Sequence, residues 1–194
     1  VKEILERQPT KNLVFLDVTR LYTDLMALPG VERVTLRKIL PNRLKVVLNQ
    51  RSPWVRIIAA EEYYIDKEGW VVVAPDRSPE LTVKGLIVEN NRVQPSEAFK
   101  LIIIQELEKW YNYYQVSSLF PLEEIDISDP DRIILRQGQK EIYLHPENLQ
   151  TGLGKLKQML RKCAEEKIQW EYIDARFKEI YLKPRNERTD NHRS

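Results

Sequence analysis

The chain has few of the residues that most often carry chemistry in proteins. Its 194 residues include one cysteine, two histidines and six glycines. The single cysteine, Cys163, excludes an intramolecular disulfide, and with His145 and His192 it offers too few ligands for a typical zinc site. Six scattered glycines exclude a glycine-rich phosphate-binding loop. We therefore expect no catalytic residue, no metal and no cofactor.

Long apolar segments are also missing. No run approaches the ~20 apolar residues of a membrane span, and no signal peptide is recognisable. The chain begins at Val1, inside a segment with the pattern of a helix and without a methionine. We expect it to be an excised region of a longer protein, with further residues upstream.

Charge of one sign does not dominate the chain. It has 31 Lys and Arg against 29 Asp and Glu, a net charge of +2, which argues against wholesale electrostatic binding of nucleic acid. Residues 1–56 nevertheless hold eleven basic and five acidic side chains, whereas residues 57–194 hold twenty basic and twenty-four acidic ones. This asymmetry indicates two modules. It also favours an acidic partner or an anionic membrane surface near the first module, although a merely solvated basic face is the commoner explanation.

The first module has the pattern of helices followed by a strand pair. The sequence predicts a helix over residues 1–8 and a second over Val18–Leu28, with Asp17 as its N-cap. Leu28-Pro29-Gly30 is expected to close that helix. Two alternating strands then flank a Pro41-Asn42 turn, and Pro53 ends the second strand.

The second module has the pattern of hairpins and two long helices. Hairpins are predicted over residues 63–73 and 133–144, with Gly85 at a bulge or close backbone contact and the last strands at 170–174 and 180–182. The acidic cluster at residues 123–126 is expected to be solvated surface, with strand alternation placing its carboxylates on different sides. The helix over 95–115 is expected to bury Phe99, Ile103, Leu107, Trp110 and Tyr114. The helix over 148–167 is expected to bury Leu149, Leu153, Leu156, Leu160 and Cys163.

Four short motifs occur in an order that resembles the FtsQ/DivIB bacterial cell-division family. They are Leu28-Pro29-x-Val31 continuing through Leu40-Pro41-Asn42-Arg43-Leu44 to Arg51-Ser52-Pro53, then Tyr64-Ile65-Asp66-x-x-Gly69, then Leu81 with Gly85, then Ile173-Asp174-Ala175-Arg176-Phe177. Phe177 departs from the family's usual tyrosine, and Trp54 from a smaller residue.

The resemblance implies an α+β fold in two domains. Residues 1–56 would form a small POTRA domain, with two helices on a short sheet whose first strand precedes Val1. Residues 57–184 would form the larger β domain, with a curved antiparallel or mixed sheet and two packed helices. Residues 185–194 are expected to be a disordered tail.

The same resemblance implies a non-catalytic divisome scaffold that helps to regulate septal peptidoglycan synthesis. Such proteins cross the bacterial inner membrane once, carry these domains on its extracytoplasmic side at the division site, and bind FtsB and FtsL. Other divisome members are expected at the POTRA domain. Family partners add a strand to the β-domain edge, which implies a partner-binding site at Arg176, Phe177, Ile180, Tyr181, Leu182 and Lys183. A last strand commonly lies at a sheet edge and can template another strand.

Three alternatives stay open from the sequence. A POTRA module also occurs in outer-membrane assembly and secretion proteins, a small hydrolase could have a dispersed site, and the basic first module could bind nucleic acid. At the C-terminal edge, the apolar residues could equally be core, with Lys183 a protective edge charge.

Overall fold

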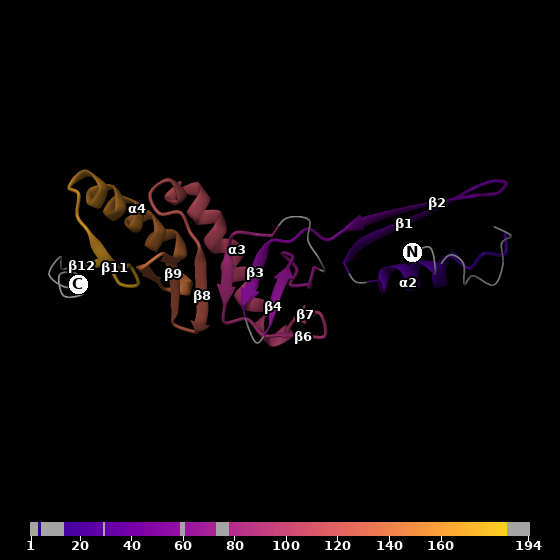
Figure 1. Ribbon diagram of the computed structural model, residues 1–194, viewed down its shortest axis with the longest axis horizontal. Helices are drawn as coiled ribbons and strands as arrows, with labels where there is room; N and C mark the ends of the chain where they lie inside the picture. Colours follow the sequence, from indigo (N-terminus) through magenta and orange to yellow (C-terminus); the bar gives the residue numbers. More distant parts are fainter. Residues whose placement is uncertain (1–3, 5–13, 29, 59–60, 73–77, 186–194) are drawn as a thin grey trace, which may run out of the picture.

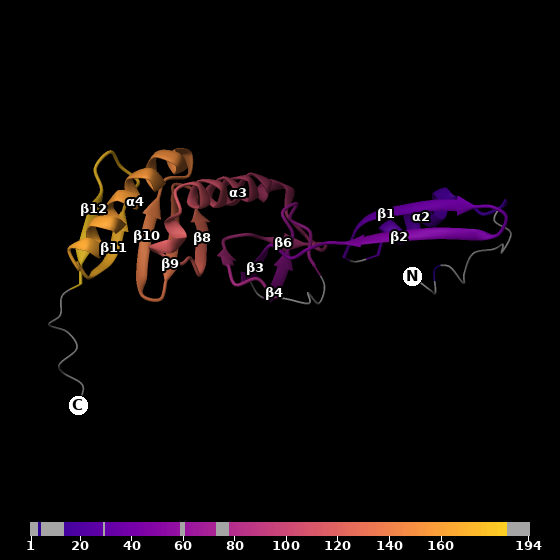
Figure 2. The ribbon, with the colours of Figure 1, turned by 90° about the horizontal axis from the view of Figure 1, so that it is seen from above.

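The computed structural model describes residues 4, 14–28, 30–58, 61–72 and 78–185. Within these ranges the chain is α+β, with helices α2, α3 and α4 and a large mixed sheet. The molecule is elongated, with a helix-and-hairpin unit at one end and the last strand at the other (Figures 1 and 2). The predicted fold class is confirmed.

The N-terminal unit packs one helix against one β-hairpin. Helix α2 (Val18–Met26) precedes strands β1 (Val31–Ile39) and β2 (Arg43–Gln50), which pair antiparallel. Asp17 caps the helix as predicted, because its carboxylate accepts the Arg20 N–H at 3.0 Å. The buried residues of this small core are Leu21, Leu25, Val31 and Val34. The predicted helix over 1–8, apart from Ile4, and Pro29 of the predicted helix end lie outside the described residues.

The C-terminal unit is built on an eight-stranded sheet with the order β12-β11-β10-β9-β8-β5-β3-β4. In chain order its strands are β3 (Val55–Ile58), β4 (Glu62–Ile65), β5 (Thr82–Lys84), β8 (Glu124–Asp129), β9 (Arg132–Gln137), β10 (Lys140–Leu144), β11 (Trp170–Asp174) and β12 (Tyr181–Pro184). The β3–β5, β5–β8 and β10–β11 pairs are parallel and the others antiparallel. A separate two-stranded ribbon joins β6 (Val88–Glu89) to β7 (Arg92–Val93).

Two helices cover one face of the large sheet (Figure 2). They are α3 (Ala98–Tyr113) and α4 (Leu149–Glu165), each preceded by a short 3-10 turn, Pro95–Glu97 and Pro146–Asn148; a third such turn, Val116–Ser118, follows α3. The predicted stripe of α4 is confirmed, because all five of its residues are buried in the main core. Cys163 is one of them, and burial raises the pKa of its thiol.

The predicted buried stripe of α3 is fully buried only at Leu107; Ile103 is partly buried against the core, and the prediction for Phe99 is wrong. The helix buries Leu101, Ile104, Leu107 and Tyr111. Phe99 is 52% exposed, while Trp110 and Tyr114 are only partly buried and stack on one another. The run Leu101-Ile102-Ile103-Ile104 is apolar on every side, so spacing alone does not select the inward face. Tyr111 is placed inside because its hydroxyl donates to the Phe120 carbonyl.

The hairpin predicted at 63–73 is only partly formed. Strand β4 pairs along its length with β3, which the sequence did not reveal, and Ile65 forms a single bridge with Val71. Residues 73–77 lie outside the described chain. Strand β3 also spans residue 56, where the sequence places the boundary between the domains.

Arg51 lies at the junction between the two units. Its backbone N–H donates to the Gly30 carbonyl at 2.9 Å, within the first unit. Its side chain, only 11% exposed, pairs with the Asp66 carboxylate and lies over the Trp70 ring, 5.0 Å from the centroid. Asp66 also accepts the N–H groups of Glu68 and Trp70, so one carboxylate orders the turn after β4 and receives the arginine.

Candidate interaction surface at the C-terminal end of the sheet

Strand β12 forms one edge of the large sheet, as the sequence predicts for a last strand. Ile180 and Leu182 are partly buried against the main core, whereas Tyr181 is 60% exposed and Lys183 is exposed. The expected alternation of an inward and an outward side is therefore present. The partner-binding role of these residues stays a prediction.

The backbone of β12 presents hydrogen-bonding groups at this edge. The Arg185 N–H donates to the Gln169 carbonyl at 3.0 Å, so Arg185 faces the neighbouring strand. Successive residues of a strand direct their N–H and C=O groups to opposite sides. Lys183 and Tyr181 consequently face β11, and the N–H and C=O of Leu182 face the open edge. Pro184 shares the outward position of Leu182 and has no N–H to offer there.

The sheet face opposite the helices carries two continuous rows of side chains. Cross-strand registers place these residues side by side across β3, β5, β8, β9, β10, β11 and β12. The first row is Arg56, Thr82, Glu124, Arg136, Glu141, Tyr172 and Lys183. The second row is Lys84, Asp126, Ile134, Tyr143, Asp174 and Tyr181.

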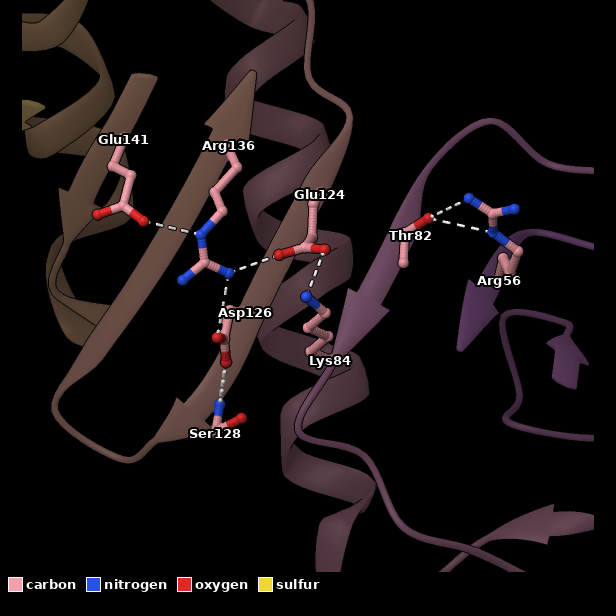
Figure 3. Close-up of polar contacts among 8 residues, drawn as sticks. All are labelled: Arg56, Thr82, Lys84, Glu124, Asp126, Ser128, Arg136 and Glu141. Carbon is pink, nitrogen blue, oxygen red and sulfur yellow. Dashed lines mark hydrogen bonds and ion pairs between the residues drawn. The ribbon is translucent and has the colours of Figure 1, made fainter. Parts of the chain in front are cut away.

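The middle of this face holds an ion-pair network around Arg136 (Figure 3). The guanidinium contacts Glu141 at 2.9 Å and Asp126 at 3.2 Å and also pairs with Glu124, which in turn pairs with Lys84 at 2.8 Å. Partial burial opposes ionisation, but the hydrogen bonds from Lys84 and Arg136 hold the pKa of Glu124 below its usual range. The expectation that the carboxylates of this segment are separated by strand alternation is wrong for Glu124 and Asp126, because residues two apart share one face.

At the start of the same row, Arg56 donates to the Thr82 hydroxyl from Nε at 3.1 Å and from Nη2 at 2.8 Å (Figure 3). The basic side chains of this part of the sheet therefore have polar partners within the chain. These contacts join neighbouring strands of the sheet.

Toward β12 the same face becomes aromatic. The rings of Tyr143 and Tyr172 stack with centroids 5.3 Å apart, and Tyr172 lies 5.9 Å from Tyr181. Arg132 lies 5.5 Å from the Tyr143 centroid, and Lys183 lies 5.8 Å from that of Tyr172. Burial and a hydrogen bond to Glu141 raise the pKa of Tyr143 to about 12. The result is a row of rings with cations beside it, a composition typical of protein interfaces.

Arg176 is paired within the chain. Its Nη2 lies 2.7 Å from Asp174 Oδ2, its Nε lies 3.0 Å from Oδ1, and its backbone N–H also donates to that carboxylate. The guanidinium lies over Tyr143 and over Phe177, which is 64% exposed. In the expected ion pair with a partner, Arg176 would therefore share its guanidinium between the partner and Asp174. The contacts with Asp174 also hold the guanidinium plane in place for stacking.

The opposite end of the molecule matches a known domain family. Residues 1–51 match the POTRA domain of FtsQ type. This match supports an FtsQ/DivIB-like family for the N-terminal unit. FtsQ-type proteins are non-catalytic cell-division scaffolds. The match covers α2, β1 and β2 and ends at Arg51, and no curated protein matches the chain.

Sequence reasoning found β12 but missed the residues beside it. Tyr143, Tyr172, Arg132 and Asp174 join the surface only through the order of the strands. Strand alternation is the sequence signal that could have placed the two tyrosines. Tyr143 and Tyr172 each adjoin a buried isoleucine, Ile142 or Ile173, and so lie on the opposite face of the sheet. Among the described residues, no helix is long and apolar enough to cross a membrane.

Proposed function

We propose that this chain is a non-catalytic divisome scaffold that links cell-division proteins and helps to regulate septal peptidoglycan synthesis. The FtsQ-type match over residues 1–51 supports this role. It favours the divisome over the outer-membrane assembly and secretion alternative. The proposed place of action is the extracytoplasmic side of the bacterial inner membrane at the division site, with a single membrane helix upstream of Val1.

The proposed partners are FtsB and FtsL, bound by strand addition at β12. The observation that carries this proposal is the outward-facing N–H and C=O of Leu182 on an edge strand beside exposed aromatic rings. A partner strand would gain backbone hydrogen bonds from the edge, and its side chains would contact Phe177 and Tyr181. Other divisome members would bind the POTRA domain.

We also propose where the two domains meet. The POTRA domain would extend to the end of β2, the β domain would begin at β3, and residues 51–54 would form the junction. This boundary keeps β3 whole within the large sheet. It refines the sequence-based limits of 1–56 and 57–184. The predicted disordered tail, apart from Arg185, lies outside the described residues.

Tyr181 offers a direct test, with Tyr113 as a matched control. Both tyrosines are largely exposed and contact other rings, but Tyr113 lies on α3, on the other side of the sheet. We expect Tyr181→Ala to weaken binding of the extracytoplasmic FtsB–FtsL pair by at least about tenfold, as for an aromatic interface anchor. Tyr113→Ala should leave the affinity unchanged. The measurement is a calorimetric titration, and equal affinities for both variants would contradict the assigned surface.

A further inference from the structure

The free end of the N-terminal unit concentrates basic side chains on two short segments. We define the distal basic end as residues 14–20 and 36–46, which contain the entry to α2 and the β1–β2 turn. These segments meet at the end farthest from the large sheet (Figures 1 and 2), where Lys38 Nζ donates to the Leu16 carbonyl at 3.1 Å. They hold five basic side chains and one carboxylate, Asp17, a net charge of +4.

Among the described residues, the cations of this end lack acidic partners, unlike Lys84, Arg136 and Lys183 of the large sheet. Within the described ranges, no carboxylate is within ion-pair distance of Arg20, Arg37, Lys38, Arg43 or Lys45. Arg37 even lies directly opposite Lys45 in the hairpin register. Like charges facing one another across strands are destabilising. An external anion would relieve that repulsion.

Apolar side chains project from the same end. Phe15 is 75% exposed, Leu40 71%, Val14 67% and Ile39 41%. Arg37, Ile39, Arg43 and Lys45 share the outer side of the hairpin, and the turn carrying Leu40 joins β1 to β2. Exposed apolar residues surrounded by cations are the composition of surfaces that bind the interface of anionic membranes.

The shape of this end suits a flat partner. The nine residues of β1 extend about 30 Å, whereas the nine residues of α2 extend about 14 Å. The hairpin therefore projects beyond the helix, as Figure 1 shows. A projecting tip contacts a planar surface more readily than it encloses a peptide.

We propose that the distal basic end docks on an anionic lipid surface. Leu40, Phe15 and their apolar neighbours would enter the headgroup region, while Arg37, Arg43 and Lys45 contact lipid phosphates. Each basic residue near such a surface contributes substantially to binding. This contact is separate from the β12 surface, which lies at the opposite end of the molecule (Figure 1). It does not depend on FtsB–FtsL binding.

The test is flotation of the full chain with vesicles of phosphatidylcholine alone or with 30% phosphatidylglycerol. We expect partitioning only into the anionic vesicles, and its loss in high salt. The double variant Arg37→Glu/Lys45→Glu keeps a like-charge pair in the hairpin, so its folding stability should match that of the parent. Its partition coefficient should fall at least about 30-fold. Leu40→Ser should lower it about tenfold.

The matched control reverses two exposed cations of the C-terminal unit, Arg161→Glu/Lys178→Glu, and should partition like the parent. Equal partitioning of the parent into both vesicle types would overturn the proposal. So would an unchanged partition coefficient in Arg37→Glu/Lys45→Glu, or an equal loss in the control. Binding of a polyglutamate peptide through Arg37 and Lys45, without vesicle binding, would assign this end to an acidic polypeptide instead.

Discussion

Gly85 allows two backbone segments, the end of β5 and strand β8, to approach each other closely. It follows β5 with φ +90°, and a Cβ placed there would lie 2.4 Å from the backbone nitrogen of Ser128 and 2.7 Å from the carbonyl carbon of Ile127. Both neighbours are backbone atoms of β8, so no side-chain rotation relieves the clash. The sequence predicted a close backbone contact here, because a glycine inside an extended segment commonly marks one.

Gly85→Ala should lower the free energy of unfolding by about 3 kcal/mol or more, since it adds a backbone clash to a positive-φ strain. Gly138→Ala is the matched control, because Gly138 also has positive φ (+56°) but has no atom within 4 Å of the added Cβ. The control should cost only about 1 kcal/mol. Urea unfolding of both variants measures the difference, and similar losses would contradict this explanation.

Residue-level features were predictable where one local rule decided them. Asp17 was recognised as a cap because the interaction spans only three residues. The roles of Arg51 and Asp66 were not recognised, although both lie in the motifs that carry the family resemblance. Their pairing joins residues 15 positions apart through a junction that no local pattern describes.

At the scale of single elements, the amphipathic pattern predicted the buried face of α4 correctly but that of α3 only in part. Polar residues separate the apolar positions of α4, so one face is defined by the sequence. Helix α3 carries apolar residues on several sides, and its orientation is decided by the sheet beneath it and by the Tyr111–Phe120 contact. Strand order was equally inaccessible, and it is strand order that assembles the Arg136 network.

The Arg136 network makes stability depend on pH. The pKa values of Glu124 and Asp126 are lowered in the folded chain, because hydrogen bonds from cations and from Ser128 outweigh burial; that of Glu141 is lowered by hydrogen bonds from Tyr143 and Arg136. Unfolded carboxylates titrate near pH 4. The stabilisation is therefore fully present above about pH 4 and is lost as the pH falls through the lower folded values.

Arg136→Met should reduce the free energy of unfolding at pH 7 by about 1–2 kcal/mol, because it leaves three neighbouring carboxylates without their shared cation while solvent screens part of the repulsion. The deficit should shrink at pH 3, because protonation of those carboxylates at low pH removes the charge that Arg136 compensates. Urea unfolding of parent and variant at both pH values is the measurement. Arg161→Met, at an exposed helical position, is the control. A deficit of the same size at both pH values would show that Arg136 acts by packing alone.

At the scale of the whole molecule, the sequence predicted two modules and their order but not their layout. The charge difference between the modules and the order of short motifs are properties of the chain itself. The β12 edge and the distal basic end lie at opposite ends of an elongated molecule, and only the fold reveals this separation (Figure 1). Contacts at one end therefore leave the other end accessible.

The central claim is that a partner strand extends the large sheet at β12, and amide hydrogen exchange at single-residue resolution tests it most directly. In the free protein, the Leu182 amide should exchange faster than those of Tyr181 and Lys183, which face β11. With saturating FtsB–FtsL extracytoplasmic domains, exchange at Leu182 should slow strongly, while Tyr181 and Lys183 change little. Unchanged exchange at Leu182 in the saturated complex, with protection elsewhere in the chain, would contradict the account.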